Sequence, residues 1–256
     1  MTIVASVKVY DGIILGADSS TQVYGNDEQG KIKLLKTYPD AQKLFRFQEL
    51  PIGVLIYGSG NIEKKSISTL LREFNNDHKY PKEANYRIET LAMELLAYFR
   101  EIYMAQYKNL NKEDQPALGM VIAGFSKGSS IGEEWEFLIP RDEKPKKIRN
   151  EEIFGASWRG ISIPFTRLYK GFDPRIKAEL EKAGVSPELL ERAFMSFISP
   201  IVFNGMPVKV AVEFVKFILK TTIGMASFEI GSPSCSEPIC VAVITATEGF
   251  KFEKEL

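Results

Sequence analysis

Residues 2–18 read TIVASVKVYDGIILGAD, and this stretch decides how the fold begins. In IVASVKV, apolar residues alternate with others, which is typical of a strand. Asp11 and Gly12 follow, and Asp-Gly between two apolar runs is the signal of a two-residue type I′ hairpin turn. IILGAD then predicts a second strand that ends at Asp18. We therefore expect the chain to begin with a β-hairpin.

The rest of the chain predicts an alternation of sheet and helix. Short apolar runs predict strands in QKLFRF, IGVLIYG, LGMVIAGFSK, EWEFLIP, EEIFGAS, PICVAVITA and GFKFEKEL. The polar YGNDEQGKIKLLKTYPD predicts a long loop after the first hairpin. Helical spacing of apolar residues predicts helices over 61–77, 88–102, 162–170, 174–183, 187–198 and 207–223. This order predicts an α+β domain with helix layers outside two mostly antiparallel sheets.

Composition limits the classes of function. A chain of 256 residues, 45% of them hydrophobic, is near the size of about 250 residues at which single cores stop growing, so we expect one domain over residues 1–256. The chain has 33 basic and 33 acidic residues, which gives no net field to attract nucleic acid or an anionic membrane. It has no apolar run of about 18 residues. We expect a cytoplasmic protein.

The scarcity of histidine and cysteine limits the chemistry. His78 is the sole histidine, so a metal site built on paired histidines is excluded, and we expect no metal and no cofactor. Cys235 and Cys240 are the only cysteines, and they are too close in sequence to form a disulfide framework. If the protein is a hydrolase without His78, its base must come from another kind of group.

Thr2 offers such a group. Removal of Met1 by an aminopeptidase would leave the Thr2 hydroxyl beside its own α-amine, and an α-amine with a pKa of about 7.7–8.0 can serve as the base for a nucleophilic threonine. Chains that begin Met-Thr are common, so the dipeptide alone favours an ordinary first strand. The residues that follow change this interpretation.

The stretch from Thr2 to Asp18 resembles, without a gap, the opening of proteasome β-type subunits and their bacterial relatives, which are N-terminal nucleophile (Ntn) hydrolases. QKLFRFQELPIGVLIYGSGNI resembles the strand, turn and glycine-ended strand that follow in that family. The resemblance implies a four-layer αββα sandwich. It places Thr2 at the nucleophile, Asp18 at the buried acid, Lys43 at the catalytic lysine and Gly58 at the oxyanion glycine. In the family, the lysine lowers the pKa of the threonine site and the glycine N–H binds the oxyanion.

Two alternatives concern the register of this match. Aligning the chain with relatives that begin TTIV would put Met1 at the nucleophile position, at the cost of an inserted residue before the turn, so we prefer the gapless version. The loop between Asp18 and Lys43 is longer than is usual in the family, and it contains three other lysines. These are Lys31, Lys33 and Lys36. None precedes an apolar strand as Lys43 does, so Lys43 remains the predicted residue.

The chain departs from the family near its C-terminus. In GSPSCSEPICVAVIT, Cys235 stands where the family has a serine, and Ser232 lies near the position of an aspartate that is missing here. In FGASWRG, Ser157 is an approximate match for another serine of the family. A hydroxyl of Ser157 or Ser232 could orient the threonine amine. The region near 173–204 carries additional helical sequence.

The resemblance implies a threonine hydrolase that cleaves a peptide or an unfolded polypeptide inside a homo-oligomeric ring, with an ATP-dependent unfoldase as a candidate partner. Two alternatives remain. One is a catalytically inactive structural subunit, which the missing acid favours. The other is an amidohydrolase of the same fold that acts on a small amide, for which a deep closed pocket would be the sign.

Overall fold

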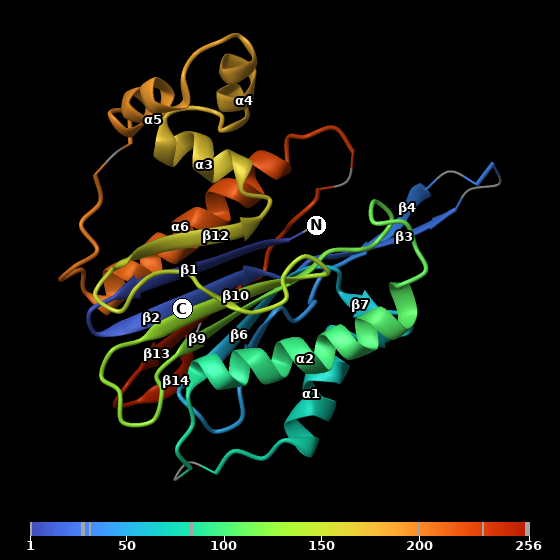
Figure 1. The fold of residues 1–256 in the computed structure, drawn as a ribbon, viewed down its shortest axis with the longest axis vertical. Helices are drawn as coiled ribbons and strands as arrows, with labels where there is room; N and C mark the ends of the chain where they lie inside the picture. The colour runs from blue at the N-terminus through green and yellow to red at the C-terminus, as the bar shows by residue number, and fades with distance from the viewer. Residues whose placement is uncertain are drawn as a thin grey trace.

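A computed structural model describes residues 2–26, 29–30, 32–81, 84–198, 200–231 and 233–253. Within these residues the strands form two larger antiparallel sheets and two small two-stranded ones (Figure 1). The order of the first sheet is β12 (Gly155–Gly160), β1 (Ile3–Val9), β2 (Gly12–Asp18), β13 (Ile239–Thr245), β14 (Gly249–Phe252). The order of the second sheet is β11 (Lys146–Lys147), β10 (Glu133–Ile139), β9 (Leu118–Gly124), β6 (Ile52–Gly58), β5 (Leu44–Arg46).

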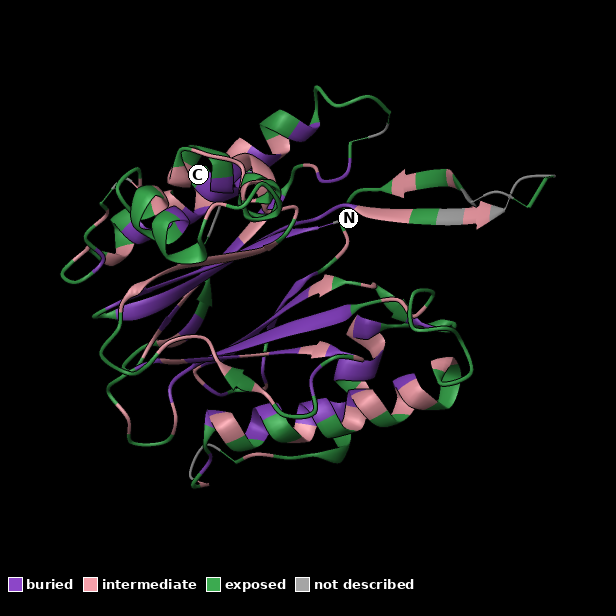
Figure 2. Ribbon diagram, turned by 45° about the horizontal axis from the view of Figure 1, so that its top comes forward, coloured by how far each residue is buried: buried purple, intermediate pink, exposed green. Residues whose placement is uncertain are grey.

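Helices cover the outer faces of these sheets. The helices are α1 (Ile67–Asp77), α2 (Ile88–Tyr107), α3 (Ile163–Lys170), α4 (Arg175–Lys182), α5 (Pro187–Met195) and α6 (Val208–Ala226). Helices α1 and α2 share an apolar cluster with the second sheet, whereas α3 and α6 share another with the first. Figure 2 shows buried strands between exposed helix surfaces. The predicted α+β class with antiparallel sheets is confirmed.

Side-chain alternation along β1 explains where the cores lie. Ile3, Ala5 and Val7 join the cluster under α6, and Val4 joins a different cluster between the two sheets. That inner cluster also contains Leu55 of β6, among other residues of the second sheet. Successive side chains of a strand point to opposite faces, so β1 buries both of its faces. The same alternation directs Thr2 towards the inner side.

The first hairpin is confirmed, but its predicted turn type is wrong. Val9 pairs with Gly12, so the two-residue loop is Tyr10 and Asp11. Neither residue has the positive φ that a type I′ turn requires. Gly12 is instead the first residue of β2, where a Cβ would lie 2.9 Å from the carbonyl oxygen of Ile244. The glycine is needed because β13 approaches closely.

The predicted long loop contains a second hairpin, which the sequence did not indicate. Strands β3 (Thr21–Asn26) and β4 (Ile32–Tyr38) pair only with each other. Figure 1 shows this hairpin projecting from the body. The predicted helix from residue 61 begins six residues later, at Ile67, after the short strands β7 (Asn61–Ile62) and β8 (Lys65–Ser66). Ser66 caps α1 by accepting a hydrogen bond from the Thr69 N–H at 3.2 Å.

The region near 173–204 folds as α4 and α5, which contribute little to the core. None of the residues of α4 is buried, and Leu190 is the buried residue of α5. No helix of the described residues combines the length and the apolarity needed to cross a membrane.

Candidate functional site

Thr2 lies directly before β1 and is buried. Its backbone carbonyl accepts a hydrogen bond from the Ile161 N–H at 2.8 Å. Gly160 passes over the same carbonyl with a φ of 85°, and a Cβ at this position would lie 1.8 Å from the Thr2 oxygen. The end of β12 therefore holds the start of β1 in place. Met1, the nucleophile of the alternative register, lies outside the described residues.

Asp18 ends β2, and the pairing of β1 with β2 brings it beside the start of the chain. Its side chain is fully buried and accepts several hydrogen bonds. Oδ1 accepts from the Ile3 N–H at 3.0 Å and from Lys43 Nζ at 2.8 Å. Oδ2 accepts from the N–H of Ser20 at 3.2 Å and from its hydroxyl at 2.9 Å. This carboxylate links Lys43 to the backbone of the residue that follows Thr2.

Lys43 precedes β5, and its side chain is 9% exposed. Burial disfavours the ammonium ion and lowers the pKa of Lys43 below its ordinary value, although the charge and hydrogen bond of Asp18 oppose this effect. Of the alternative lysines, Lys33 and Lys36 are exposed on β4, and Lys31 lies outside the described residues. The structure thus brings Lys43, and not Lys33 or Lys36, to Asp18.

Gly58 ends β6 with a φ of 86°. A Cβ at this position would lie 2.3 Å from the carbonyl oxygen of Ala117, and that carbonyl accepts the Ser59 N–H at 2.8 Å. Both the left-handed backbone and the close approach of Ala117 require glycine here. The backbone of Gly58 therefore has a defined conformation at the end of β6.

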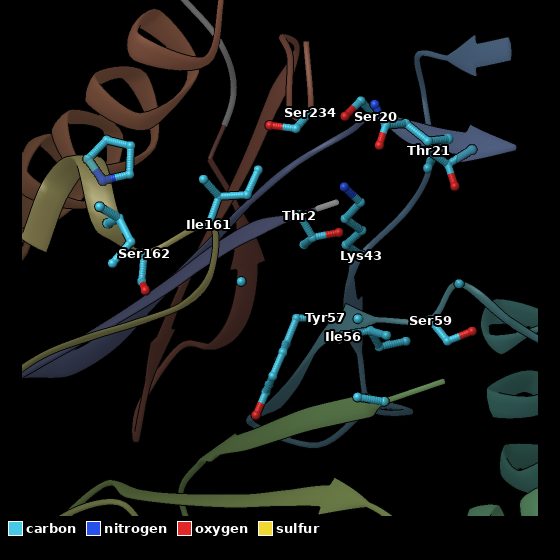
Figure 3. A pocket seen from close by; sticks show the side chains of 18 of the residues that line it. Thr2, Ser20, Thr21, Lys43, Ile56, Tyr57, Ser59, Ile161, Ser162 and Ser234 are labelled. Carbon is cyan, nitrogen blue, oxygen red and sulfur yellow. The ribbon is translucent and has the colours of Figure 1, made fainter. Parts of the chain in front are cut away.

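Thr2, Lys43 and Gly58 line one cleft with a volume of about 2120 Å³. Figure 3 shows Thr2 beside Lys43, with Tyr57 below them and Ser162 across the cleft. The other walls come from β3, from the start of α3 and from the end of α6, which contributes Met225 and then Phe228 just beyond it. Residues far apart in the sequence therefore converge on one cleft.

Of the two predicted hydroxyls, the described residues include only Ser157, which lies outside the cleft. Ser157 lies on β12 opposite Ser6, does not line the cleft and accepts a hydrogen bond from Arg149. Ser232 lies outside the described residues, and its role stays a prediction. Ser234 lines the cleft and is 5% exposed, and its Oγ has no hydrogen-bond partner within the described part of the chain.

Ser20 and Ser162 also line the cleft, and the sequence analysis missed both. Ser20 lies two residues after Asp18, the spacing at which an aspartate carboxylate commonly accepts a backbone N–H, so this signal was present in the sequence. For Ser162 and Ser234 the signal is weak, because neighbouring serines lie close to each of them and only the fold decides which hydroxyl faces the cleft.

Cys235 and His78 are the other titratable side chains that the sequence analysis considered, and neither lines the cleft. Burial raises the pKa of the Cys235 thiol to about 12, so this thiol stays protonated at neutral pH. His78 lies at the end of α1, where its ring stacks on Phe74, outside the cleft. Across the described ranges, no group of three or more His, Cys, Asp or Glu side chains is placed to hold a metal ion.

Comparisons with known proteins find the fold but no family. No protein-family model and no curated protein matches the chain. Solved structures do match. Anbu (ancestral beta-subunit) from Yersinia bercovieri is 14% identical with a TM-score of 0.55, over 99% of this chain and 87% of that one. An Anbu (Gly-1) mutant from Hyphomicrobium sp. strain MC1 is 12% identical with a TM-score of 0.57, over 100% and 86%. The Anbu complex from Pseudomonas aeruginosa, described as a helical assembly, is 13% identical with a TM-score of 0.54, over 99% and 87%.

These matches correct the family assignment made from the sequence. The resemblance to proteasome β-type subunits and their bacterial relatives is wrong as an assignment, because the matching structures are Anbu proteins and no family model matches. The resemblance depended on motifs around two strand pairs and on the order of elements along the chain, and both determine a fold more than a family. At 12–14% identity, the likeness to Anbu shows the fold alone.

Proposed function

We propose that this chain is an N-terminal threonine hydrolase that cleaves peptide bonds. One observation carries the proposal: Lys43, which is buried and paired with Asp18, lines the same cleft as Thr2 and Gly58. Cleavage of the bond before Thr2 would free its α-amine. An amine with a pKa of about 7.7–8.0 can take the proton of the Thr2 hydroxyl at neutral pH.

Five residues have a role in this proposal. The Thr2 oxygen attacks the carbonyl carbon of the substrate, and the Gly58 N–H donates to the oxyanion that forms. The ammonium of Lys43 favours the anionic form of the Thr2 hydroxyl. Asp18 fixes Lys43 through the bond between Oδ1 and Nζ. The hydroxyl of Ser234 is the candidate that orients the amine, because it is buried at the cleft without a hydrogen-bond partner among the described residues.

The size of the cleft favours a peptide over a small amide. Pockets for small molecules typically have volumes of about 300–1,000 Å³, and this cleft of about 2120 Å³ is larger. Its walls come from both sheets and from the ends of helices, which leaves room for an extended chain. A peptide or an unfolded polypeptide is therefore the substrate class that we propose.

The proposal extends to the domain and its assembly. We take residues 1–256 as one four-layer αββα domain of the Ntn type, with α4 and α5 as an additional helical segment near 173–204. The exposed apolar side chains of Phe197 and Val202 support a contact between copies of the chain. The Pseudomonas aeruginosa Anbu structure is described as an assembly. We propose a homo-oligomer, which sedimentation at micromolar concentration would detect.

Replacement of Thr2 tests the proposed function. Intact mass first identifies protein in which the chain begins at Thr2. Turnover of short fluorogenic peptides by this protein should fall by at least about a thousandfold in Thr2→Ala, because the nucleophile is lost. Thr2→Ser should keep part of the activity, since it keeps the hydroxyl and the amine but loses the methyl group that restricts the rotamer.

Ser6→Ala is the matched control. Ser6 is buried on the same face of β1 as Thr2 but does not line the cleft, so removing its hydroxyl should leave turnover unchanged. Hydrolysis that survives in Thr2→Ala, or correctly processed wild-type protein that hydrolyses no peptide, would show that Thr2 is not the nucleophile of a peptidase.

A further inference from the structure

A charged cluster joins the two sheets at the side of the cleft. Glu136 of β10 accepts two hydrogen bonds from Arg159 of β12, from Nε to Oε1 at 2.6 Å and from Nη2 to Oε2 at 2.9 Å. Glu136 Oε1 also accepts the Tyr57 hydroxyl of β6 at 2.5 Å. Because β12 belongs to the first sheet and β6 and β10 to the second, the carboxylate of Glu136 connects the sheets.

The position of Tyr57 depends on a glycine in the strand between β6 and β10. Gly119 of β9 lies opposite Tyr57, and a Cβ on Gly119 would lie 2.0 Å from the ring carbon Cζ. The ring therefore passes over the bare backbone of β9 to reach Glu136. Tyr57 also lines the cleft, as Figure 3 shows. This packing leaves the ring little freedom, so the hydroxyl has a defined direction.

The cluster is charged in the folded protein. Burial alone would raise the pKa of Glu136, but hydrogen bonds from Arg159 and Tyr57 and the charge of Arg159 outweigh burial and hold that pKa below its usual value. Arg141 adds a further positive charge near the carboxylate. Charge-assisted bonds of this kind are shorter and stronger than neutral ones, and the bidentate contact of Arg159 also fixes the direction of its side chain.

Both partners of Glu136 directly precede a glycine of the proposed site. Arg159 directly precedes Gly160, which packs on the Thr2 carbonyl, and Ile161 then donates its N–H to that carbonyl. Tyr57 directly precedes Gly58, the proposed oxyanion donor. Thr2 directly precedes β1 of the first sheet, and Gly58 ends β6 of the second. Through Glu136, the cluster links the residue before Gly160 to the residue before Gly58.

We propose that Glu136 is a positioning residue that sets the distance between Thr2 and the Gly58 N–H by binding Arg159 on one sheet and Tyr57 on the other. The inference rests on the proposed function for its catalytic consequence. Displacing a reacting group by about 1 Å can cost about a hundredfold in rate. The oxyanion contact exists only once the carbonyl has been attacked, so the loss falls on kcat and not on KM.

Glu136→Gln tests this role, with Glu134→Gln as its matched control. Glu134 lies two residues earlier on the same face of β10 and forms a buried ion pair with Arg149, which also donates to Ser157 of β12, and none of these residues lines the cleft. We expect Glu136→Gln to lower kcat by about 10- to 100-fold with KM within about twofold of wild type. Glu134→Gln should leave both kinetic constants of the folded protein unchanged. Equal kcat values in the two variants would overturn the proposal.

A second pair of variants avoids any change of charge. Tyr57→Phe removes one hydroxyl from the cluster, and Tyr107→Phe removes the hydroxyl at the end of α2 that accepts the Glu63 N–H at 3.0 Å, away from the cleft. We expect kcat to fall in Tyr57→Phe but not in Tyr107→Phe. A kcat that is unchanged in Tyr57→Phe, or that falls equally in both variants, would show that the Tyr57 bond has no positioning role.

Amide hydrogen exchange separates this inference from the proposed function. If processed wild-type protein hydrolyses no peptide, the proposed function fails, but the exchange rate of the Ile161 N–H can still be measured. That amide should exchange faster in Glu136→Gln and Tyr57→Phe, because its hydrogen bond to the Thr2 carbonyl loses support. It should exchange at the wild-type rate in Glu134→Gln and Tyr107→Phe. Unchanged exchange at Ile161 in Glu136→Gln would overturn the positioning role whatever the activity.

Discussion

Replacing Lys43 with methionine should destabilise the fold, because it leaves the Asp18 carboxylate buried without a counter-charge. The side chain of Asp18 is 0% exposed and that of Lys43 is 9% exposed. Removal of one partner of a buried ion pair typically costs about 3–5 kcal/mol. The N–H of Ile3 and both donors of Ser20 would still bind Asp18, so we expect the low end, about 3 kcal/mol. For a chain of this size, this lowers Tm by about 6–12 °C.

Asp18→Asn should cost more than Lys43→Met. An asparagine has one acceptor oxygen and one NH₂ group, and both oxygens of Asp18 accept from donors. In one orientation the NH₂ group of the asparagine would face the Ile3 N–H and the Lys43 ammonium, and in the other it would face the Ser20 N–H. We therefore expect Asp18→Asn to lower the free energy of unfolding by about 4–5 kcal/mol. The double variant should cost less than the sum of the two single variants, since the first change already breaks the pair.

Urea unfolding at pH 7 measures these free energies, with the midpoint shifting at constant slope. Lys65→Met is the control, because Lys65 forms an exposed pair with Glu73 at 2.9 Å, and exposed pairs contribute about 0–1 kcal/mol. The reasoning is refuted if Lys43→Met costs no more than Lys65→Met. It is also refuted if the costs of Lys43→Met and Asp18→Asn add to within about 0.5 kcal/mol.

Two further predictions concern the backbone at Thr2 and the protonation of Lys43. Gly160→Ala should abolish activity and cost more than Gly128→Ala in urea unfolding. Both glycines have positive φ, but only at Gly160 would a Cβ meet Thr2, at 1.8 Å, and equal costs would argue against that contact. The lowered pKa of Lys43 means that the unfolded chain binds this proton more tightly. The free energy of unfolding should therefore rise between the folded pKa of Lys43 and about 10.4, and Lys43→Met should remove that rise. An unchanged pH profile in Lys43→Met would contradict this expectation.

The sequence predicted the elements whose side chains pack in a core. The apolar spacing of 88–102 predicted α2, which has seven buried residues, and the alternation in IVASVKV predicted β1. The hairpin of β3 and β4 was missed because those strands pair only with each other and have no core face to impose alternation. The turn was predicted at Asp11 and Gly12 but lies at Tyr10 and Asp11, because Gly12 is needed where β13 packs closely against β2. A periodic spacing of apolar residues arises where side chains pack in a core, so strands that pack against no core show no such spacing.

The candidate site was predictable where a side chain follows directly from a strand. Asp18 ends a buried strand and Lys43 precedes one, so their placement depended only on elements that the sequence indicates well. The cluster of Tyr57, Glu136 and Arg159 could not be predicted. Tyr57 lies 79 positions from Glu136 in the sequence, and Arg159 lies 23 positions from it. Their contacts depend on the strand order of the second sheet and on how that sheet packs against the first.

The missing acid near the C-terminus raises the question of what would orient the Thr2 amine. Cys235, at the position where a serine was expected, is protonated at neutral pH, because burial raises the pKa of its thiol to about 12. Ser234 is the better candidate. A buried hydroxyl without a hydrogen-bond partner costs about 1–3 kcal/mol, and the Ser234 Oγ has none within the part of the chain that the structure describes. Ser234 and Thr2 line the same cleft. That the Ser234 hydroxyl is unpaired among the described residues is explained if it gains a hydrogen-bond partner when the Thr2 amine is freed or when a substrate binds.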